Sequence, residues 1–180
     1  MQKKQKKVVL GVSAGISIYK SCDILRRLQD EGFSVTVIMT RESRELIRPI
    51  VFESLSGEKA YCELFDSPGD WDIKHISLAK KADLLLIAPA TANIIAKIAS
   101  GICDDLLTCT VLATTSPVLI APAMNENMYN NKITQANIAR LKGLGFVFVG
   151  PEKGRLACGD IGNGCLAKTE EIVKAVKKNI

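Results

Sequence analysis

Short apolar runs alternate with segments of helical periodicity along nearly the whole chain, and this alternation most constrains the fold. Each run is continuous rather than interleaved with polar residues, which is typical of parallel strands buried on both faces. The predicted strands are Lys7–Val12, Phe33–Met39, Asp83–Ala88, Pro117–Ala121 and Phe146–Val149. Strand–helix alternation predicts an α/β fold, a single domain with a doubly wound, mainly parallel sheet and helices on both faces, Rossmann-like or flavodoxin-like.

The segments between these strands are predicted to be helical. One helix runs from about Ile18 to Leu28 with Gly32 as its stop, and a second stretch extends to about Leu55 and is interrupted by Pro49. Later helices are expected over 92–99, 134–144 and 169–178, the last with Thr169 as its N-cap. Residues 56–74 are the least regular, and we expect there a loop that moves or contacts a partner.

Charge and length exclude several classes of protein. The net charge is +5, but seven lysines lie within the first seven and last seven of the 180 residues, so the body of the chain is slightly acidic. We therefore divide the chain into a basic tail, 1–6, and one domain, 7–180. Aromatic residues make up only 5%, and we expect no nucleic-acid binding. No apolar run reaches the ~18 residues of a membrane span, so no membrane insertion is expected.

The histidine and cysteine content restricts the possible chemistry further. A single histidine excludes zinc sites built on two or three imidazoles, and we predict no metal site. The six cysteines form no CxxC pair and no regular framework. They are interpreted as mostly reduced thiols, which predicts a cytoplasmic location.

A ligand site is expected at one edge of the sheet, because ligands of doubly wound sheets bind beyond the carboxyl ends of the strands. The segments that follow the predicted strands hold most of the small and turn-forming residues of the chain. These segments are 13–15, 40–43, 89–93, 122–125 and 150–164.

The first of these segments, together with the two residues before it, reads GVSAG at 11–15. This sequence resembles two known motifs, but neither of them fits. It fits the GxSxG nucleophile elbow, which needs several strands before it, whereas this one follows the first strand. It is not GxGxxG, so a dinucleotide fingerprint is not supported. We interpret Ser13, Ala14 and Gly15 as a turn that lets an anion reach the following helix N-terminus, with a plain tight turn as the alternative.

Hydroxyl and amide side chains follow the next two strands. Thr40 and Ser43 offer hydroxyls for phosphate or ring contacts, and Thr91 and Asn93 flank small residues that suit a flat ring close to the backbone. For both pairs the alternative is helix capping.

Three residues stand out as candidates for chemistry. His75 is the only imidazole available as a base near pH 7. Asn125 either caps the helix after it or donates its amide to a carboxylate. Cys158 lies in a polar, glycine-rich stretch, where a thiol carried on a moving flap is a better interpretation than a buried structural cysteine.

Together the motifs GVSAGISIYK, IAPATANIIAK, DDLLT, APAMNENM and LACGDIGNG resemble the phosphopantothenoylcysteine decarboxylases of coenzyme A synthesis. These belong to the homo-oligomeric flavin-containing cysteine decarboxylases. The resemblance runs from about residue 7 to 168, and its most specific parts are PxMNxxM at 122–128 and ACGD at 157–160.

The resemblance implies an FMN enzyme without net redox change. It implies that the cysteine thiol of 4′-phosphopantothenoylcysteine is oxidised to a thioaldehyde, that loss of CO2 leaves an enethiolate, and that reduction yields 4′-phosphopantetheine. His75 and Cys158 are the implied catalytic residues of the oxidative and reductive halves. The implied substrate-binding residues are Asn125, Met128, Arg155, Leu156 and Ala157. The implied FMN-binding residues are Ser13, Ala14, Gly15, Thr40, Arg41, Glu42, Thr91, Ala92, Asn93, Ile94 and Ala123.

The resemblance also implies a homo-oligomer, a trimer or dodecamer with FMN at subunit interfaces. Two departures from the family pattern are visible, Tyr129 where the family has Trp, and Cys165-Leu166-Ala167 after GNG, where the fused enzymes usually have Arg-Met. No residues encode the synthetase domain of the fused enzymes, so another chain performs ligation or the chain is cut from a longer one. The alternatives are a peptidyl-cysteine decarboxylase and a flavin-binding regulatory protein of the same fold.

Overall fold

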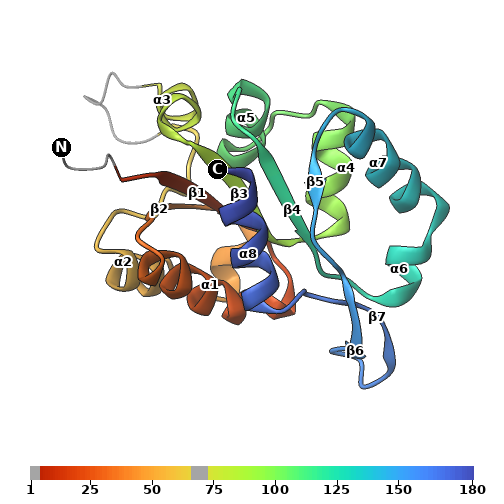
Figure 1. Ribbon diagram of the computed structural model, residues 1–180. Helices are drawn as coiled ribbons and strands as arrows, with labels where there is room; N and C mark the ends of the chain where they lie inside the picture. The colour runs from red at the N-terminus through yellow and green to blue at the C-terminus, as the bar shows by residue number, and fades with distance from the viewer. Residues whose placement is uncertain (1–4, 66–72) are drawn as a thin grey trace.

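Five parallel strands form the central sheet of the computed structural model, which describes residues 5–65 and 73–180. In space the strand order is β2-β1-β3-β4-β5 (Figure 1). The strands are β1 (Lys7–Val12), β2 (Ser34–Met39), β3 (Leu84–Ala90), β4 (Val118–Pro122) and β5 (Val147–Phe148). The predicted doubly wound α/β fold is confirmed, and each predicted strand overlaps an observed one.

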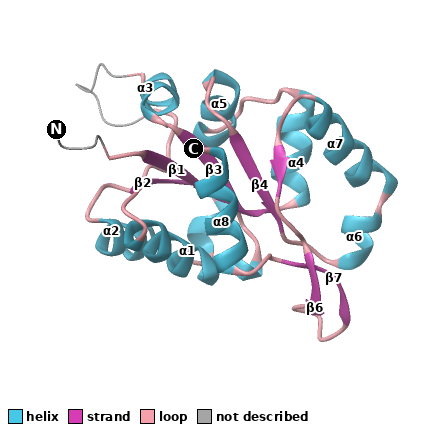
Figure 2. Cartoon of the chain, in the orientation of Figure 1, coloured by secondary structure: helices cyan, strands magenta, loops and turns pink. Residues whose placement is uncertain are grey.

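Helices cover both faces of the sheet (Figure 2). One face carries α1 (Tyr19–Asp30), α2 (Pro49–Ser56) and α8 (Thr169–Asn179). The other carries α3 (Lys74–Lys81), α4 (Ala92–Ser100), α5 (Leu106–Ala113) and α7 (Lys132–Gly143). Shorter helices, η1 (Ile16–Ile18), η2 (Glu42–Glu45) and α6 (Glu126–Asn130), follow the carboxyl ends of β1, β2 and β4.

Along each continuous apolar strand, successive side chains pack alternately against the two helix layers. Along β1, Val8 and Leu10 pack in the core beneath α1 and α8, whereas Val9 packs in the core beneath α4 and α5. In β3, Leu84 and Leu86 face the first core and Leu85 and Ile87 the second. Successive side chains of a strand point to opposite faces, so a strand buried on both sides needs an apolar residue at every position.

Two helix ends were predicted from single residues, with different outcomes. Gly32 lies just beyond α1 with a φ of 85°, as expected for a glycine that ends a helix. Thr169 is not the N-cap of α8, because that position belongs to Lys168. The Glu152 carboxylate accepts a hydrogen bond from the Lys168 amide at 3.1 Å, which holds Lys168 in an extended conformation, and the helix starts one residue earlier than an N-cap at Thr169 would allow.

A feature missing from the prediction is a two-stranded antiparallel hairpin formed by β6 (Glu152–Arg155) and β7 (Ile161–Cys165). It projects from the end of the sheet below β4 and β5 in Figure 1. We refer to residues 152–165 as the hairpin. Sequence analysis predicted no strands in this stretch, so the hairpin was missed.

Two other predicted segments are only partly described. In the irregular stretch 56–74, Tyr61 pairs with Ile38 of β2 in an isolated parallel bridge, and residues 66–72 lie outside the described residues. In the basic tail, residues 1–4 lie outside them, while Lys6 forms an ion pair with Asp83 at 3.1 Å. Within the described parts, none of the helices is long and apolar enough to cross a membrane.

Gly11, near the carboxyl end of β1, allows α5 to pack closely on the sheet. A Cβ atom at this position would lie 2.5 Å from Cδ1 of the buried Leu107. We expect Gly11→Ala to lower the free energy of unfolding by about 1–3 kcal/mol, because overpacking forces core side chains to shift. Urea unfolding measures the change.

A matched substitution controls for the exchange of glycine for alanine. A Cβ atom on Gly143, the last residue of α7, would meet nothing within 4 Å beyond the backbone of its own helix. Gly143→Ala is expected to leave stability unchanged or raise it by roughly 0.5–1 kcal/mol, because alanine loses less backbone entropy in a helix. Equal unfolding free energies for the two variants would contradict the close-packing argument.

Candidate functional site

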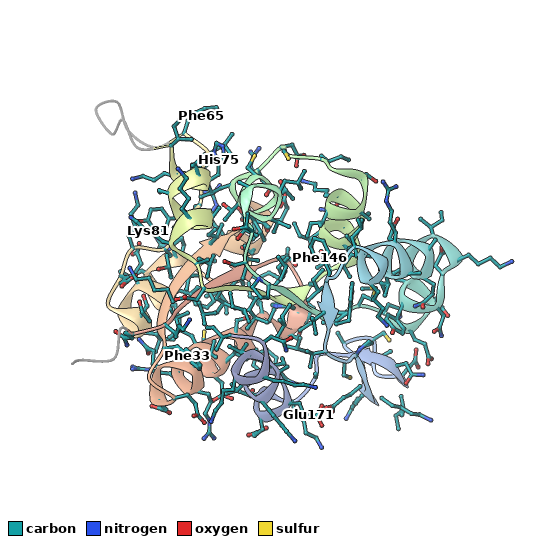
Figure 3. The ribbon with its side chains drawn as sticks, turned by 45° about the horizontal axis from the view of Figure 1, so that its top comes forward. Phe33, Phe65, His75, Lys81, Phe146 and Glu171 are labelled. Atoms are coloured by element: carbon teal, nitrogen blue, oxygen red, sulfur yellow. The ribbon has the colours of Figure 1, made fainter. Side chains whose placement is uncertain are left out.

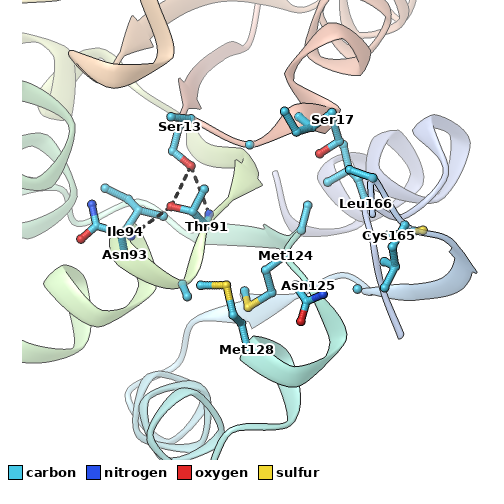
Figure 4. A pocket seen from close by; sticks show the side chains of 18 of the residues that line it. Ser13, Ser17, Thr91, Asn93, Ile94, Met124, Asn125, Met128, Cys165 and Leu166 are labelled. Carbon is cyan, nitrogen blue, oxygen red and sulfur yellow. Dashed lines mark hydrogen bonds between the residues drawn. The ribbon is translucent and has the colours of Figure 1, made fainter. Parts of the chain in front are cut away.

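A cavity of about 830 Å³ lies at the carboxyl ends of β1, β3 and β4. Its walls come from the loops after these strands, the first turns of α1 and α4, and the hairpin (Figure 4). Its size is within the usual range of roughly 300–1,000 Å³ for cofactor and small-molecule sites. The predicted site residues that line it are Ser13, Ala14, Gly15, Thr40, Glu42, Thr91, Ala92, Asn93, Ile94, Ala123, Asn125, Met128, Arg155, Leu156, Ala157 and Cys158.

The Ser13 hydroxyl joins the loops that follow β1 and β3. It donates to the backbone carbonyl of Pro89 at 2.8 Å and accepts from the Thr91 amide at 3.1 Å. Thr91 in turn caps α4, its hydroxyl accepting from the Ile94 amide at 3.3 Å. Both hydroxyls therefore have structural hydrogen bonds, and Ser13 is only 2% exposed, which disfavours a nucleophilic serine at this turn.

The turn after β1 contains a buried polar atom that lacks a partner. Ser17 lines the cavity, and its side-chain oxygen is buried without a hydrogen-bond partner in the described parts of the chain. A buried hydroxyl left unpaired costs about 1–3 kcal/mol, so such a group indicates a missing ligand atom. Lys20, one turn further along, also lines the cavity. The N-terminal end of η1 and α1 favours negative charge for the same position.

The segment after β2 combines a cavity wall with a tight turn. Thr40 is buried and lines the cavity, and its hydroxyl accepts from the Ser43 amide at 3.4 Å. Ser43 does not line the cavity. Its hydroxyl instead donates to the Thr40 carbonyl at 2.7 Å. For Ser43 the local-turn alternative therefore holds. Arg41 is exposed and does not line the cavity, unlike its neighbour Glu42.

The hairpin is fixed to the loop that follows β4. The Met124 amide donates to the Gly164 carbonyl at 3.0 Å, and the Asn163 amide donates to the Glu126 carboxylate at 2.8 Å. A side chain at Gly164 would collide with the Met124 carbonyl, so only glycine allows this approach. The docked hairpin places Arg155 through Cys158 along the cavity wall, with Leu156 buried.

Asn125 and Cys158 come together across this junction. The Asn125 side-chain oxygen caps α6 by accepting from the Asn127 amide at 2.9 Å, which turns its NH2 group towards the hairpin. This NH2 group donates to Sγ of Cys158 at 3.8 Å. The capping role and the site role predicted as alternatives for Asn125 are thus compatible, because they use different atoms of one amide.

His75 does not lie with these residues. It is the second residue of α3, is half-buried, and does not line the cavity of this chain. Figure 3 shows His75 at the same end of the molecule as Phe65. The structure therefore does not bring the two predicted catalytic residues, His75 and Cys158, together within one subunit.

Sequence analysis missed a charged cluster at the cavity wall. Lys97 lines the cavity and forms ion pairs with Asp104 at 2.8 Å and Asp105 at 3.3 Å. The hydrogen bond to Asp104 raises the pKa of Lys97 and lowers the pKa of the Asp104 carboxyl. Lys97 follows Asn93 by four residues on one face of α4, and this spacing was the signal that could have identified it.

Tyr129, the departure from the family pattern, is half-buried and packs against the core beneath α4 and α7. No group of three or more His, Cys, Asp or Glu side chains suited to a metal ion occurs among residues 5–65 and 73–180.

Comparison with known proteins identifies the family. The flavoprotein family model matches residues 1–180. The chain belongs to the flavoprotein family. The coenzyme A biosynthesis bifunctional protein CoaBC of Vibrio vulnificus is 46% identical over 168 residues, which are 93% of this chain and 42% of that protein. CoaBC of Bacillus subtilis is 45% identical over 172 residues, 96% of this chain and 42% of that protein. The chain thus spans less than half the length of these curated relatives.

Similar solved structures support this family assignment. A mutant PPC decarboxylase complexed with pantothenoylaminoethenethiol has a TM-score of 0.86 and 32% identity, over 97% of this chain and 98% of that one. The FMN-dependent cysteine decarboxylase SpaF has a TM-score of 0.82 and 31% identity, over 96% of this chain and 98% of that one.

The cavity of this flavoprotein fits a phosphorylated flavin. The unpartnered Ser17 hydroxyl, Lys20 and the N-terminal turn of α1 suit a phosphate group. Gly15 lines the same cavity and adds no side chain to it. Small residues along 90–93 leave room for a flat ring on the other wall.

Because docking of the hairpin depends on Gly164, this flavoprotein offers a direct test of the junction. We expect Gly164→Ala to detach the hairpin from Met124 and to speed tryptic cleavage after Lys153 and Arg155 by about 10-fold or more, since local opening becomes easier. Timed proteolysis followed by mass spectrometry measures the rate. Gly143→Ala is the control, and an unchanged cleavage rate in Gly164→Ala would show that the contact does not hold the hairpin.

Proposed function

We propose that this chain catalyses the FMN-dependent decarboxylation of 4′-phosphopantothenoylcysteine to 4′-phosphopantetheine and CO2, a step of coenzyme A biosynthesis. One observation carries the proposal. A single cavity combines the turn after β1 with the unpartnered Ser17 hydroxyl, the Asn125 amide and the Cys158 thiol on a docked hairpin. The names of the similar proteins, CoaBC and PPC decarboxylase, support the same substrate.

Each part of the cavity has a role in this reaction. An α-amido carboxylate has no electron sink, and bound FMN supplies the oxidising and reducing capacity that creates one. Ser13, Ala14, Gly15 and Ser17 hold the phosphate end, whereas Thr40, Glu42, Ala123 and residues 91–94 surround the ring.

The remaining cavity residues act on the substrate. The Asn125 amide donates to the substrate carboxylate. Because the amide is neutral, it binds the carboxylate without the added stabilisation that a positive charge would give. Arg155, Leu156 and Ala157 of the hairpin cover the substrate, Met128 packs beside it, and Cys158 delivers a proton in the reductive half. Because Cys158 serves only that half, its presence favours a decarboxylase that completes the reduction.

The two rival functions differ in what the protein releases. A peptidyl-cysteine decarboxylase acts on a cysteine-ended peptide and stops at the enethiol. A flavin-binding regulatory protein of the same fold holds FMN without turnover of either substrate.

The test measures CO2 from purified protein supplied with FMN. We expect release from phosphopantothenoylcysteine, with phosphopantetheine as the co-product, and at least 100-fold less from a cysteine-ended peptide, because the peptide lacks the anionic pantothenoyl arm. Faster CO2 release from the peptide would replace the proposal with the peptidyl activity. Yellow protein that releases no CO2 from either substrate would favour the regulatory function, and failure to bind FMN would exclude all three.

We further propose that a second copy of the chain completes the site by contributing His75 as the base of the oxidative half. His75 is absent from the cavity lining of its own subunit, and the residues near it in sequence expose apolar surface, Phe65 to 86% and Ile73 to 61%. At the cavity mouth Ile16 and Tyr19 are 65% and 62% exposed. Two exposed apolar regions, one beside His75 and one beside the cavity, suit head-to-tail association into a closed ring, such as the trimer or dodecamer of the family.

Mixed oligomers test this shared site. His75→Asn is expected to abolish initial flavin reduction and Cys158→Ser to allow flavin reduction but block phosphopantetheine release. When the two inactive variants are unfolded, mixed and refolded together, we expect part of the activity to return, because some interfaces pair an intact His75 with an intact Cys158. Each variant refolded alone is the control. Mixed oligomers that remain inactive would place the base elsewhere.

We also propose a cytoplasmic location, supported by the six cysteines, none of which forms a disulfide bond.

A further inference from the structure

Two cysteines lie close together beside the ion pairs of Lys97. Cys103 belongs to the loop after α4 and Cys109 to the first turns of α5, so that they flank Asp104 and Asp105 in the sequence. Sγ of Cys109 donates to the backbone carbonyl of Cys103 at 3.4 Å. Neither cysteine lines the cavity, and the proposed reaction uses neither of them. Their proximity therefore has no explanation in the flavin site itself.

The contact between Cys109 and the Cys103 backbone places the two thiols within reach of a disulfide bond. A carbonyl oxygen lies about 2.4 Å from the Cα atom of its own residue, so Sγ of Cys109 is at most about 6 Å from Cα of Cys103. In a disulfide of ordinary geometry this distance is about 4 Å. Sγ of Cys103 has a long contact of 3.8 Å to the Gly101 carbonyl, so little opposes its rotation. Rotation of this exposed side chain and a small shift of its loop would therefore join the two sulfur atoms.

Another two cysteines at a similar separation in the sequence, Cys158 and Cys165, are held apart by the hairpin. Cys165 pairs with Glu152 at one end of β6, whereas Cys158 lies beyond Arg155 at the other end. Three residues of strand already span ~10 Å, whereas a disulfide needs Cα atoms within about 7 Å of each other. This second pair therefore cannot be joined while the hairpin is intact, and it serves as an internal control.

The thiols of Cys103 and Cys109 differ in their access to solvent. Cys103 is exposed and Cys109 is half-buried. Burial raises the pKa of the Cys109 thiol, and the Cys103 side chain raises it further through its charge and a hydrogen bond. Because the attacking species in disulfide exchange is the thiolate, partial burial and a raised pKa make Cys109 a slow first reactant. A reagent in solution therefore meets Cys103 first, and Cys109 is placed to react second.

We propose that Cys103 and Cys109 form a reversible disulfide and that this bond stiffens the cavity wall that contains Lys97. The oxidant is a low-molecular-weight disulfide of the glutathione class. The Cys103 thiolate attacks one of its sulfur atoms, the S–S bond breaks, and one thiolate leaves and takes up a proton. The Cys109 thiolate then attacks the Cys103 sulfur of the mixed disulfide and displaces the second thiolate. In total the two protein thiols lose two electrons and two protons, and the added disulfide becomes two thiols.

Asp105 links this bond to the cavity. The disulfide would close a ring over residues 103–109, which contains both acidic partners of Lys97. Asp105 lines the cavity together with Lys97 and caps α5, its carboxylate accepting from the Thr108 amide at 2.8 Å. A cross-link removes the extended conformations through which such a segment opens. The wall therefore opens less often in the oxidised protein than in the reduced protein.

The first test treats the FMN-loaded protein with oxidised glutathione in the absence of other thiols. Digestion after lysine and before aspartate places Cys103 on a peptide of residues 98–103 and Cys109 on a peptide of residues 105–132, and neither peptide has another cysteine. We expect the two peptides to be joined by a disulfide that dithiothreitol breaks. This link should form about 10-fold faster or more than any link between Cys158 and Cys165, because only the first pair lies within reach.

Two serine variants separate the steps. In Cys109→Ser a glutathione adduct on Cys103 is expected to accumulate, because no second thiol displaces it. In Cys103→Ser the uptake of glutathione by Cys109 is expected to be about 10-fold slower or more than the uptake by Cys103 in the other variant, because Cys109 is half-buried. A stable adduct on Cys103 of the unmodified protein, or a link between Cys103 and Cys109 no faster than one between Cys158 and Cys165, would overturn the proposal.

The second test measures amide hydrogen exchange of the cavity wall. We expect the amides of Lys97 and of residues 103–109 to exchange several-fold more slowly in the disulfide form than in the reduced form. The glutathione adduct of Cys109→Ser is the control and should show no slowing. Unchanged exchange in the disulfide form would overturn the proposed stiffening. None of these measurements depends on CO2 release, so they decide the inference independently of the proposed decarboxylation.

Discussion

Burial of the sheet on both faces is the constraint on which the rest of this structure depends. The central strands β1 and β3 have helices above and below, so polar side chains are excluded from nearly all their positions. Functional groups can therefore stand only beyond the strand ends, where the loops meet. Ser13 shows how these loops become a single surface, because its hydroxyl is bonded to the Pro89 carbonyl and the Thr91 amide of the neighbouring strand's loop. The cavity is the consequence of this junction.

The periodicity of the sequence was sufficient to predict the sheet, because short continuous apolar runs between helical segments are typical of parallel strands that are covered on both faces. It was insufficient for α5 and for the hairpin. Helix α5 is buried around most of its circumference, with Leu106, Leu107, Thr108, Thr110 and Val111 all inside, so it has no polar stripe to mark its period.

The hairpin is rich in glycine and polar residues, which by themselves indicate a loop. Its ordering comes from Met124 and Glu126, more than 30 residues earlier in the chain, through bonds to Gly164 and Asn163. Contacts of this kind depend on the completed fold and leave no local pattern. The misplaced N-cap of α8 has the same origin, since Glu152 of the hairpin determines the conformation of Lys168.

A residue's position at the cavity could be predicted where a strand end determines it, and could not be predicted elsewhere. The loops after β1, β2, β3 and β4 all reach the cavity, as the rule for doubly wound sheets requires. Lys97 was missed because it enters from a helix rather than a strand end. His75 precedes β3 and lies on α3, and no rule of strand topology brings that position to the carboxyl edge of the same subunit. Its function in the proposed reaction therefore requires surface from another copy.

The proposed proton donor does not stand on the sheet itself, because it is carried by the hairpin that docks on the loop after β4. The Cys158 thiol is held by two contacts, since Sγ accepts from the Asn125 amide at 3.8 Å and donates to the Asp160 carboxylate at 3.4 Å. Asn125 follows β4 at the edge of the sheet, whereas Asp160 lies on the same hairpin turn as the thiol, so the position of Cys158 depends on both the sheet and the hairpin.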